Sequence, residues 1–197
     1  MSALTDDIIP RILTLTGPSH DRHIIVAVDG RCGSGKSTLA DIIRDRLESE
    51  YDISTQIFHM DDFYLRPEQR TEERMSEPGW NSDRARFIKE VLTPLMQNEQ
   101  ISYIRYDCAS QSLCEPRIIK PGTVNIVEGS YSCHPDLIGL YDLTVFMTVG
   151  PDEQIRRIRQ RDGDLKLELY EQKWIPLEEQ YFAAFDVADS CDIKGTL

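Results

Sequence analysis

Short apolar runs recur along the chain at the length of β-strands. The first, residues 23–29 (HIIVAVD), is almost continuously apolar, which is typical of a strand buried on both faces of a parallel sheet. Further runs predict strands over residues 53–60, 123–127, 143–149 and 188–193. Each run is far shorter than the roughly 18 apolar residues that a membrane-spanning helix needs.

Between these runs, apolar residues recur at intervals of three and four, the period of an amphipathic helix. After Lys36 they fall at Leu39, Ile42, Ile43 and Leu47. Similar patterns predict helices over residues 4–15, 83–97, 152–161 and 169–185. Three of these ranges contain a proline. We expect the first helix to be broken near Pro10, whereas Pro94 can kink or shorten its helix and Pro176 can divide its helix into two pieces. Strands that alternate with helices predict an α/β fold with a parallel sheet flanked by helices.

Two stretches fall outside this alternation. Residues 62–82 are polar, with Pro67, Pro78 and Gly79, and predict an active-site loop or cover. Residues 101–121 predict a short β excursion. Since no repeat, low-complexity tract or linker divides the 197 residues, we expect one domain over 1–197.

The charge of the chain limits its partners. Its formal net charge is −12 at pH 7, whereas binding to nucleic acid or to an anionic membrane needs neutralising cations. We therefore expect neither partner, and an anionic ligand must meet a local positive site. Asp6 and Asp7 stand where a signal peptide would be positively charged. Five cysteines without a C-x-x-C pair indicate reduced thiols and a cytoplasmic location, and their spacing with histidine predicts no zinc site.

Directly after the first strand, residues 28–38 (VDGRCGSGKST) contain a complete G-x-x-x-x-G-K-S pattern. Glycines let such a loop curl until its N–H groups converge on phosphates, and the following helix adds its positive dipole end. The lysine supplies a charge for the β- and γ-phosphates, and the serine hydroxyl supplies a ligand for Mg²⁺. The residues predicted to bind the nucleotide are Gly30, Gly33, Ser34, Gly35, Lys36, Ser37 and Thr38.

Acidic residues follow two of the predicted strands. The second strand runs into Asp61 and Asp62, and the third is followed by Glu128. Ligands of open α/β sheets bind at the carboxyl ends of strands, where a carboxylate can hold Mg²⁺ or accept the proton of an attacking hydroxyl. Asp83 precedes a predicted helix, and the sequence leaves two interpretations open: a helix N-cap, or a carboxylate that grips sugar hydroxyls.

Four arginines lie within six residues: Arg156, Arg157, Arg159 and Arg161. They form either a solvated helix face or a lid that neutralises charge on a transferring phosphoryl group. Helical spacing places the first with the third, and the second with the fourth, so we expect only one pair to face the site.

Together these motifs resemble the uridine kinase family of P-loop kinases and its relatives that phosphorylate nicotinamide riboside. The resemblance covers about residues 24–185 as short blocks in the same order. After the glycine loop these blocks are DDFY (61–64), NSD (81–83), YDCASQS (106–112), VEGSY (127–131) and RRIRQRD (156–162), and WIPLEEQY (174–181) is more similar to the riboside kinases. The resemblance implies a P-loop NTPase-type α/β fold, with a lid over about residues 152–170 and a small substrate-covering insertion over about 62–82 and 101–121.

The resemblance also implies ATP and Mg²⁺ as cofactors and gives roles to the residues of the phosphate side. Asp61 matches the acid that activates the acceptor hydroxyl and lies near the metal. Ser37 and Glu128 match the other groups around Mg²⁺. Arg157 and Arg161 are the expected lid arginines, Arg157 toward ATP and Arg161 as a catalytic residue beside Asp61 and Lys36.

On the acceptor side, Asp83 matches the acid that holds the ribose hydroxyls, and Tyr106 matches an aromatic of the nucleoside pocket. Tyr64 and Gln111 are expected to contact the substrate as well, together with Asp61 and Glu128. Gln111 stands where uridine kinases use a histidine to recognise the base, and Leu113 replaces a basic residue. These departures weaken the case for a uracil or cytosine substrate, although glutamine can still pair with a base edge or a carboxamide.

The leading hypothesis is an ATP- and Mg²⁺-dependent kinase that phosphorylates a primary hydroxyl of a small molecule, foremost the 5′-hydroxyl of a nucleoside or riboside. A kinase for another hydroxylated metabolite, such as pantothenate or a sugar, is the alternative in the same class. A nucleotide-gated switch is less favoured, because the chain has no N-K-x-D motif for guanine. A binding module without catalysis is disfavoured by the complete set of Lys36, Ser37, Asp61 and Glu128. The sequence leaves open the acceptor, the choice between ATP and GTP, and whether the chain forms a homo-oligomer.

Overall fold

The central sheet of the computed structural model has five parallel strands in the order β2-β5-β1-β6-β7. The structure describes residues 2–17 and 22–196. The strands are β1 (Ile24–Gly30), β2 (Thr55–His59), β5 (Val124–Glu128), β6 (Leu143–Thr148) and β7 (Ile193–Thr196). Every residue of the central β1 is buried, which explains why its sequence is almost continuously apolar.

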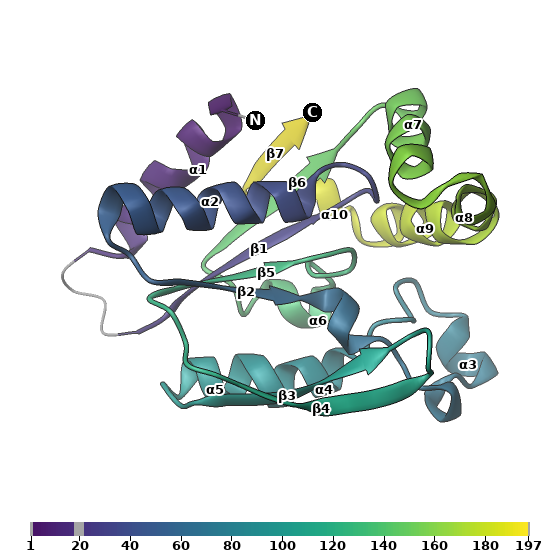
Figure 1. The fold of residues 1–197 in the computed structure, drawn as a ribbon, viewed down its shortest axis with the longest axis horizontal. Coiled ribbons are helices and arrows are strands. Elements are labelled where there is room, and N and C mark those ends of the chain that lie inside the picture. Colours follow the sequence, from purple (N-terminus) through teal and green to yellow (C-terminus); the bar gives the residue numbers. More distant parts are fainter. Residues whose placement is uncertain (1, 18–21, 197) are drawn as a thin grey trace.

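Helices cover both faces of this sheet (Figure 1). On one face lie α1 (Ser2–Leu15) and α2 (Lys36–Tyr51), and their buried apolar side chains pack in one cluster with those of β1, β5 and β6. On the other face lie α4 (Arg84–Phe87), α5 (Thr93–Met96) and α6 (Pro135–Ile138), whose apolar side chains form a second cluster around Phe58. The predicted α/β class with a parallel, helix-flanked sheet is confirmed.

The remaining elements gather at the edge where the strands end (Figure 1). On one side of this edge are the three helices α7 (Pro151–Asp162), α8 (Asp164–Leu169) and α9 (Ile175–Phe185). On the other side are α3 (Glu72–Met75) and the antiparallel hairpin of β3 (Ile101–Asp107) and β4 (Ser112–Ile119). The predicted β excursion is therefore this hairpin. Across the part of the chain that the structure describes, no helix is long and apolar enough to cross a membrane.

Two predicted helices continue past a proline through a wider, π-helical turn. Such a turn, Ile88–Leu92, joins α4 to α5 just before Pro94. A second, Tyr170–Trp174, joins α8 to α9 just before Pro176. A proline lacks an N–H group and its ring crowds the carbonyl four residues earlier, so a widened turn makes room for the ring. These two prolines therefore alter their helices without ending them. The predicted break near Pro10 is wrong, because α1 continues from Ser2 to Leu15 with Pro10 inside it.

The last predicted strand is wrong in position. The sequence predicts a strand over residues 188–193, but α10 (Val187–Ser190) occupies the first half of this range and β7 begins only at Ile193. Val187 packs beneath α9 rather than in the sheet. Asp192 then directs the chain into β7, because its carboxylate accepts hydrogen bonds from the N–H and the hydroxyl of Thr144 at 2.8 and 2.7 Å.

One buried carboxylate connects three parts of the fold. Asp29, near the end of β1, is 0% exposed. It accepts hydrogen bonds from the N–H groups of Tyr131 and Cys133, in the loop after β5, at 3.2 and 2.8 Å, and from the Tyr181 hydroxyl on α9 at 2.8 Å. Burial raises the pKa of Asp29 to about 6, although these hydrogen bonds and the charge of Lys36 oppose the shift. Asp29 therefore fixes the loop after β5 and α9 relative to β1.

We expect Asp29→Asn to lower the free energy of unfolding by about 2–4 kcal/mol, because the amide leaves buried donors without an acceptor. Since folding raises this pKa from 3.8 to about 6, the stabilisation from Asp29 is complete below pH 4 and is lost as the pH rises through 6. Asparagine does not titrate, so Asp29→Asn should lower the free energy of unfolding by about 1 kcal/mol more at pH 5 than at pH 8.

Urea unfolding at the two pH values measures both effects. The exposed Asp45 of α2 offers a control, Asp45→Asn, with an expected change below about 0.5 kcal/mol. A loss of the same size at pH 5 and pH 8 would show that the pKa of Asp29 is not raised.

Candidate active site

The glycine loop follows β1 and leads directly into α2. Gly30 and Gly35 have φ angles of 138° and 92°, and a Cβ at Gly30 would lie 1.9 Å from the carbonyl oxygen of Met147. Only glycine adopts this backbone without strain. Of the described side chains, none caps the N-terminus of α2 at Lys36, so the first N–H groups of the helix can bind an anion. Loop and helix together form a cradle for phosphates.

Lys36 lies within this cradle and is 9% exposed. Its Nζ donates to the carbonyl oxygens of Gly30 and Arg31 at 2.6 and 3.0 Å, and lies 3.4 Å from Ser130 Oγ. An ammonium group on a flexible stem can exchange one set of oxygen acceptors for another. Lys36 can therefore move from these carbonyls to phosphate oxygens.

Glu128 lies at the end of β5 and is 6% exposed. Ser37 Oγ donates to its Oε2 at 3.0 Å, and the Nδ1 atom of His59, paired with it in the β2–β5 register, lies 2.5 Å from its Oε1. Burial acts to raise the pKa of Glu128, but the hydrogen bond and charge of His59, with Ser37 and Lys36, lower it below its ordinary value. The hydrogen bond to Glu128 also raises the pKa of His59 above 6.5.

The adjacent carboxylates of Asp61 and Asp62 face different parts of the molecule. Asp61 faces the cavity, and its Oδ1 accepts a hydrogen bond from the Tyr64 hydroxyl at 2.8 Å. The protein that surrounds it on its other sides raises the pKa of Asp61, an effect that the charge of Glu128 increases and the Tyr64 bond opposes. Asp62 instead accepts a hydrogen bond from the hydroxyl of Tyr103 in β3 at 3.0 Å. Asp61 is thus the candidate proton acceptor, and Asp62 fixes the hairpin.

Helix α9 places a further carboxylate against the glycine loop. Glu178 is 4% exposed, and its two oxygens accept hydrogen bonds from the N–H of Cys32 at 2.9 Å and from the Ser130 hydroxyl at 2.6 Å. The next residue, Glu179, pairs with Arg31. No role is predicted for these acids from the sequence. The sequence shows them only as two adjacent glutamates in the WIPLEEQY block. The fold is needed to show that α9 packs against the glycine loop.

The four arginines of α7 divide into two pairs. Arg157 and Arg161 line the cavity. Arg157 Nη1 donates to the carbonyl oxygen of Gly33 at 3.2 Å, and Arg161 Nη2 donates to the Tyr170 hydroxyl at 3.0 Å. Arg156 and Arg159 are not among the lining residues described, and they pair with Glu153 and Asp164. The two lining arginines also have acid partners, Glu153 for Arg157 and Asp162 for Arg161. This division follows the helical spacing that the sequence predicts, and the roles of the inner pair remain predictions.

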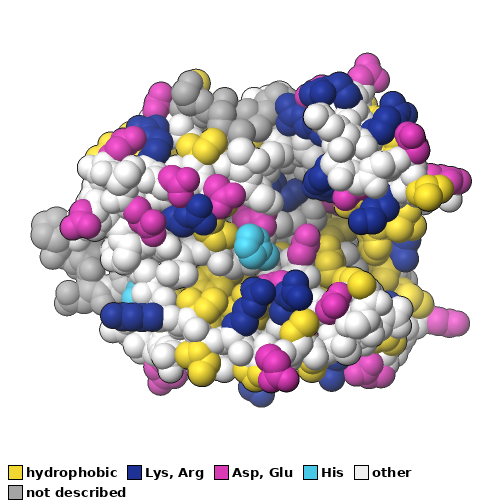
Figure 2. Space-filling view, viewed as in Figure 1, with side chains coloured by type: hydrophobic (Ala, Val, Ile, Leu, Met, Phe, Trp, Pro, Cys, Tyr) yellow, Lys and Arg dark blue, Asp and Glu magenta, His cyan; other side chains and the backbone are white. Residues whose placement is uncertain are grey.

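These groups meet in a cavity of about 860 Å³ between helices α7, α8 and α9 and the hairpin side of the sheet edge. Figure 2 shows this face hollowed between the two sides, with lysine and arginine side chains along both rims. The predicted site residues that line the cavity are Gly33, Gly35, Lys36, Ser37, Thr38, Asp61, Tyr64, Glu128, Arg157 and Arg161. Three aromatic residues for which the sequence predicts no role also line the cavity: Tyr131, Tyr170 and Trp174. Gly30 and Ser34 belong to the same loop but are not among the lining residues described.

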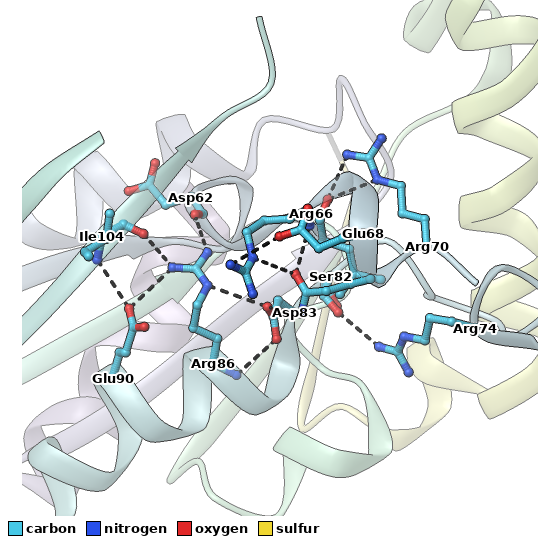
Figure 3. Close-up of polar contacts among 12 residues, drawn as sticks. Asp62, Arg66, Glu68, Arg70, Arg74, Ser82, Asp83, Arg86, Glu90 and Ile104 are labelled. Atoms are coloured by element: carbon cyan, nitrogen blue, oxygen red, sulfur yellow. Dashed lines mark hydrogen bonds and ion pairs between the residues drawn. The ribbon is translucent and has the colours of Figure 1, made fainter. Parts of the chain in front are cut away.

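Three residues predicted to bind the substrate lie elsewhere in the described structure. Asp83 caps α4 by accepting a hydrogen bond from the N–H of Arg86 at 3.2 Å, and it accepts another from Gln69 Nε2 at 2.9 Å (Figure 3). It lines a separate pocket of about 340 Å³. Tyr106 is 2% exposed on β3, and Gln111 is exposed in the hairpin turn with a φ of 51°. The structure therefore shows Asp83 as an N-cap, and a contact of this residue with a substrate remains a prediction.

The donor groups fit a nucleotide with Mg²⁺. This cation prefers oxygen ligands, keeps several waters, and is usually held by one or two carboxylates together with substrate phosphates. Ser37, Glu128 and Asp61 offer such oxygens beside the phosphate cradle. Within residues 2–17 and 22–196, no group of three or more His, Cys, Asp or Glu side chains could hold a metal by itself. The oxygens of Ser37, Glu128 and Asp61 therefore suit a cation that arrives with the nucleotide.

Comparison with known proteins gives matches along most of the chain. A sequence model of the phosphoribulokinase / uridine kinase family matches residues 25–166. A uridine kinase of Limosilactobacillus reuteri (strain DSM 20016) is 27% identical over 146 residues, which are 72% of this chain and 66% of that protein. The chain thus spans slightly less than two thirds of the length of this relative.

Solved structures share the fold at lower identity. A structure described as a possible uridine kinase from Bacillus stearothermophilus has a TM-score of 0.67 at 18% identity, over 95% of this chain and 98% of that one. A D-glycerate 3-kinase from Cryptococcus neoformans var. grubii has a TM-score of 0.64 at 15% identity, over 90% and 88%. These likenesses establish the P-loop kinase type of α/β fold that the sequence predicts.

The contact between His59 and Glu128 can be tested by a histidine titration. We expect the pKa of His59 to lie above 6.5, and Glu128→Gln to lower it by about one unit, because the variant removes the charged acceptor. NMR of the ring protons measures both values. His134, whose pKa is lowered to about 4 by burial and by the charge of Arg84, should not respond to the variant. A His59 pKa that is the same in both proteins would mean that the pair does not form in solution.

Proposed function

We propose that this chain, which belongs to the phosphoribulokinase / uridine kinase family, is a kinase that transfers the γ-phosphoryl group of ATP to a primary hydroxyl of a small molecule, foremost the 5′-hydroxyl of a riboside. One observation carries the proposal: a phosphate cradle and a carboxylate with a raised pKa, Asp61, line the same cavity. A nucleotide-gated switch needs the cradle but has no use for a proton acceptor that faces a second ligand.

Asp61 is the proposed general base. A raised pKa makes a carboxylate a stronger base, and the Tyr64 hydroxyl holds the carboxylate by one oxygen. The other oxygen, Oδ2, has no hydrogen-bond partner among the described residues and is available to an acceptor hydroxyl. Asp61 then takes the proton of that hydroxyl as the oxygen attacks phosphorus.

The remaining residues of the cavity position and stabilise the transferring group. Ser37 and Glu128 would hold Mg²⁺, which would supply positive charge to neutralise the nucleotide phosphates. Lys36 and the lid arginines add positive charge where the transition state becomes more negative. A lid that excludes water favours transfer over hydrolysis of the nucleotide.

A second candidate is a kinase for another hydroxylated metabolite, such as pantothenate or a sugar. The placement of Gln111 favours it, because this residue is exposed in the hairpin turn and outside the described lining of the cavity. A base-recognising contact at Gln111 would require the hairpin turn to move.

We expect Asp61→Asn to reduce phosphoryl transfer at least about 100-fold, because it removes the proton acceptor. Nucleotide affinity should stay within about twofold, since the cradle is unchanged. The measurements are ATP consumption over a panel of nucleosides, nicotinamide riboside and pantothenate, and nucleotide binding by calorimetry. Lys36→Ala, which removes a phosphate contact, is the control that should impair both. Equal losses of binding and transfer in Asp61→Asn would rule out the assigned role.

The two pairs of α7 arginines allow a matched comparison. Arg161→Ala should lower kcat by about 10- to 100-fold, because it removes a positive charge from the cavity. Arg159→Ala, on the outer side of the same helix, should change kcat by less than about twofold. Steady-state kinetics with the best acceptor of the panel measures both. Similar effects of the two substitutions would indicate a structural role for the helix rather than charge stabilisation.

A further inference from the structure

A chain of hydrogen bonds leads from α9 to the lysine of the glycine loop. Ser130 Oγ lies 2.6 Å from Glu178 Oε1 and 3.4 Å from Lys36 Nζ. A carboxylate accepts hydrogen bonds but cannot donate one, so the single proton of the Ser130 hydroxyl goes to Glu178. The lone pairs of the serine oxygen are then left to the ammonium group. Glu178 therefore sets which way the hydroxyl points and makes Ser130 an acceptor for Lys36.

A second acceptor lies within reach of the same hydroxyl. Ser130 Oγ is 3.5 Å from the carbonyl oxygen of Gly30, which is also the closest of the three acceptors of Lys36, at 2.6 Å. If Glu178 did not take the hydroxyl proton, that proton could turn toward this carbonyl. Serine and lysine would then compete for one oxygen, and the ammonium group would lose a defined position.

Glu178 also holds the peptide group that carries the remaining acceptor of Lys36. Its Oε2 accepts a hydrogen bond from the N–H of Cys32 at 2.9 Å, and Lys36 Nζ donates to the carbonyl oxygen of Arg31 at 3.0 Å. This N–H and this carbonyl belong to one planar peptide group, so a contact that fixes the N–H also fixes the direction of the carbonyl. Figure 1 shows α9 beside the loop between β1 and α2, where these contacts are made.

The charge of Glu178 is not explained by the packing of α9 alone. The residue is 4% exposed, and among the described residues no lysine, arginine or histidine nitrogen lies within 4.0 Å of its oxygens. Burial of an unpaired carboxylate costs free energy. A glutamine would fill the same space and bond both partners, by accepting from Cys32 and donating to Ser130. Only a carboxylate accepts from both partners at once.

We propose that Glu178 is a positioning residue for Lys36: through Ser130 and through the peptide group between Arg31 and Cys32, it fixes two of the three acceptors that hold the ammonium group. A lysine that starts from a defined position loses less conformational freedom when phosphate oxygens replace these acceptors. The inference rests on the proposed function, because it concerns the nucleotide side of the same cavity.

The test measures nucleotide affinity with and without the lysine. Glu178→Gln keeps the size of the side chain but cannot accept two hydrogen bonds, and Ser130→Ala removes the link itself. Each is also combined with Lys36→Ala, so that a double-mutant cycle isolates the part of the effect that passes through the lysine. Glu171→Gln, at an exposed position before α9, is the control. Displacement of a fluorescent ATP analogue in the presence of Mg²⁺ measures affinity, and steady-state kinetics gives kcat and KM.

We expect Glu178→Gln and Ser130→Ala each to weaken ATP binding by about 3- to 30-fold, the range in which a single hydrogen bond contributes. In the Lys36→Ala background, either substitution should change the affinity by less than about twofold, because no ammonium group remains to be oriented. In the wild-type background kcat should fall as well, whereas KM for the acceptor should stay within about twofold. Glu171→Gln should match the wild type.

Two results would overturn the inference while the proposed function stands. Equal losses of affinity with and without Lys36 would mean that Glu178 only docks α9 on the loop. Tighter ATP binding by Glu178→Gln would mean that the carboxylate repels the phosphates instead of positioning the lysine. Because Ser130→Ala changes no residue of α9, it decides the question even if Glu178→Gln does not fold.

Failure of the proposed function gives a different pattern. If the wild type binds ATP but no acceptor raises its consumption above that of Lys36→Ala, phosphoryl transfer fails, and the binding cycle still decides the role of Glu178. If the wild type binds no ATP, the proposed function and this inference both fail.

Discussion

The buried carboxylate of Asp29 ties the phosphate cradle to the walls of the cavity. Its oxygens accept hydrogen bonds from the loop after β5 and from α9, and Asp29 itself stands one residue before the glycine loop begins. The loop after β5 carries Ser130, and α9 carries Glu178. Glu178 accepts hydrogen bonds from the Ser130 hydroxyl and from the N–H of Cys32 in the glycine loop. Because the loop after β5 and α9 are both hydrogen-bonded to Asp29, the spacing of the cradle and the cavity walls depends on this carboxylate.

A second constraint is the parallel sheet. Parallel strands end at the same edge, so β1, β2 and β5 deliver the glycine loop, Asp61 and Glu128 to one place. The carboxylates then acquire different properties from their neighbours. Glu128 is surrounded by the positive or donating groups of His59, Ser37 and Lys36, which favour its charge, whereas the protein around Asp61 disfavours charge. One acid is thereby suited to a cation and the other to a proton.

Much of this arrangement could be predicted from the sequence, for identifiable reasons. The glycine pattern after an apolar run specifies the cradle, because only that context lets the loop meet a helix N-terminus. The four-residue spacing of Arg157 and Arg161 similarly specifies one face of α7. Asp61 could be distinguished from Asp62 only through the resemblance, and the structure supplies the physical reason in the contact of Asp62 with the hairpin.

Other features depend on contacts between distant segments, which a local pattern does not encode. The bond of Glu178 to the glycine loop spans 146 residues of sequence. The role of Asp83 as a cap requires knowledge of where Gln69 and Arg86 lie. The acceptor side was therefore the part least accessible to the sequence.

Transfer to a hydroxyl, rather than hydrolysis, is tested most directly by following ATP and Mg²⁺ with the enzyme and each acceptor by ³¹P NMR. We predict the appearance of a phosphate monoester of the acceptor in step with the formation of ADP. Formation of inorganic phosphate alone, at a rate that no acceptor changes, would contradict a kinase function for this site.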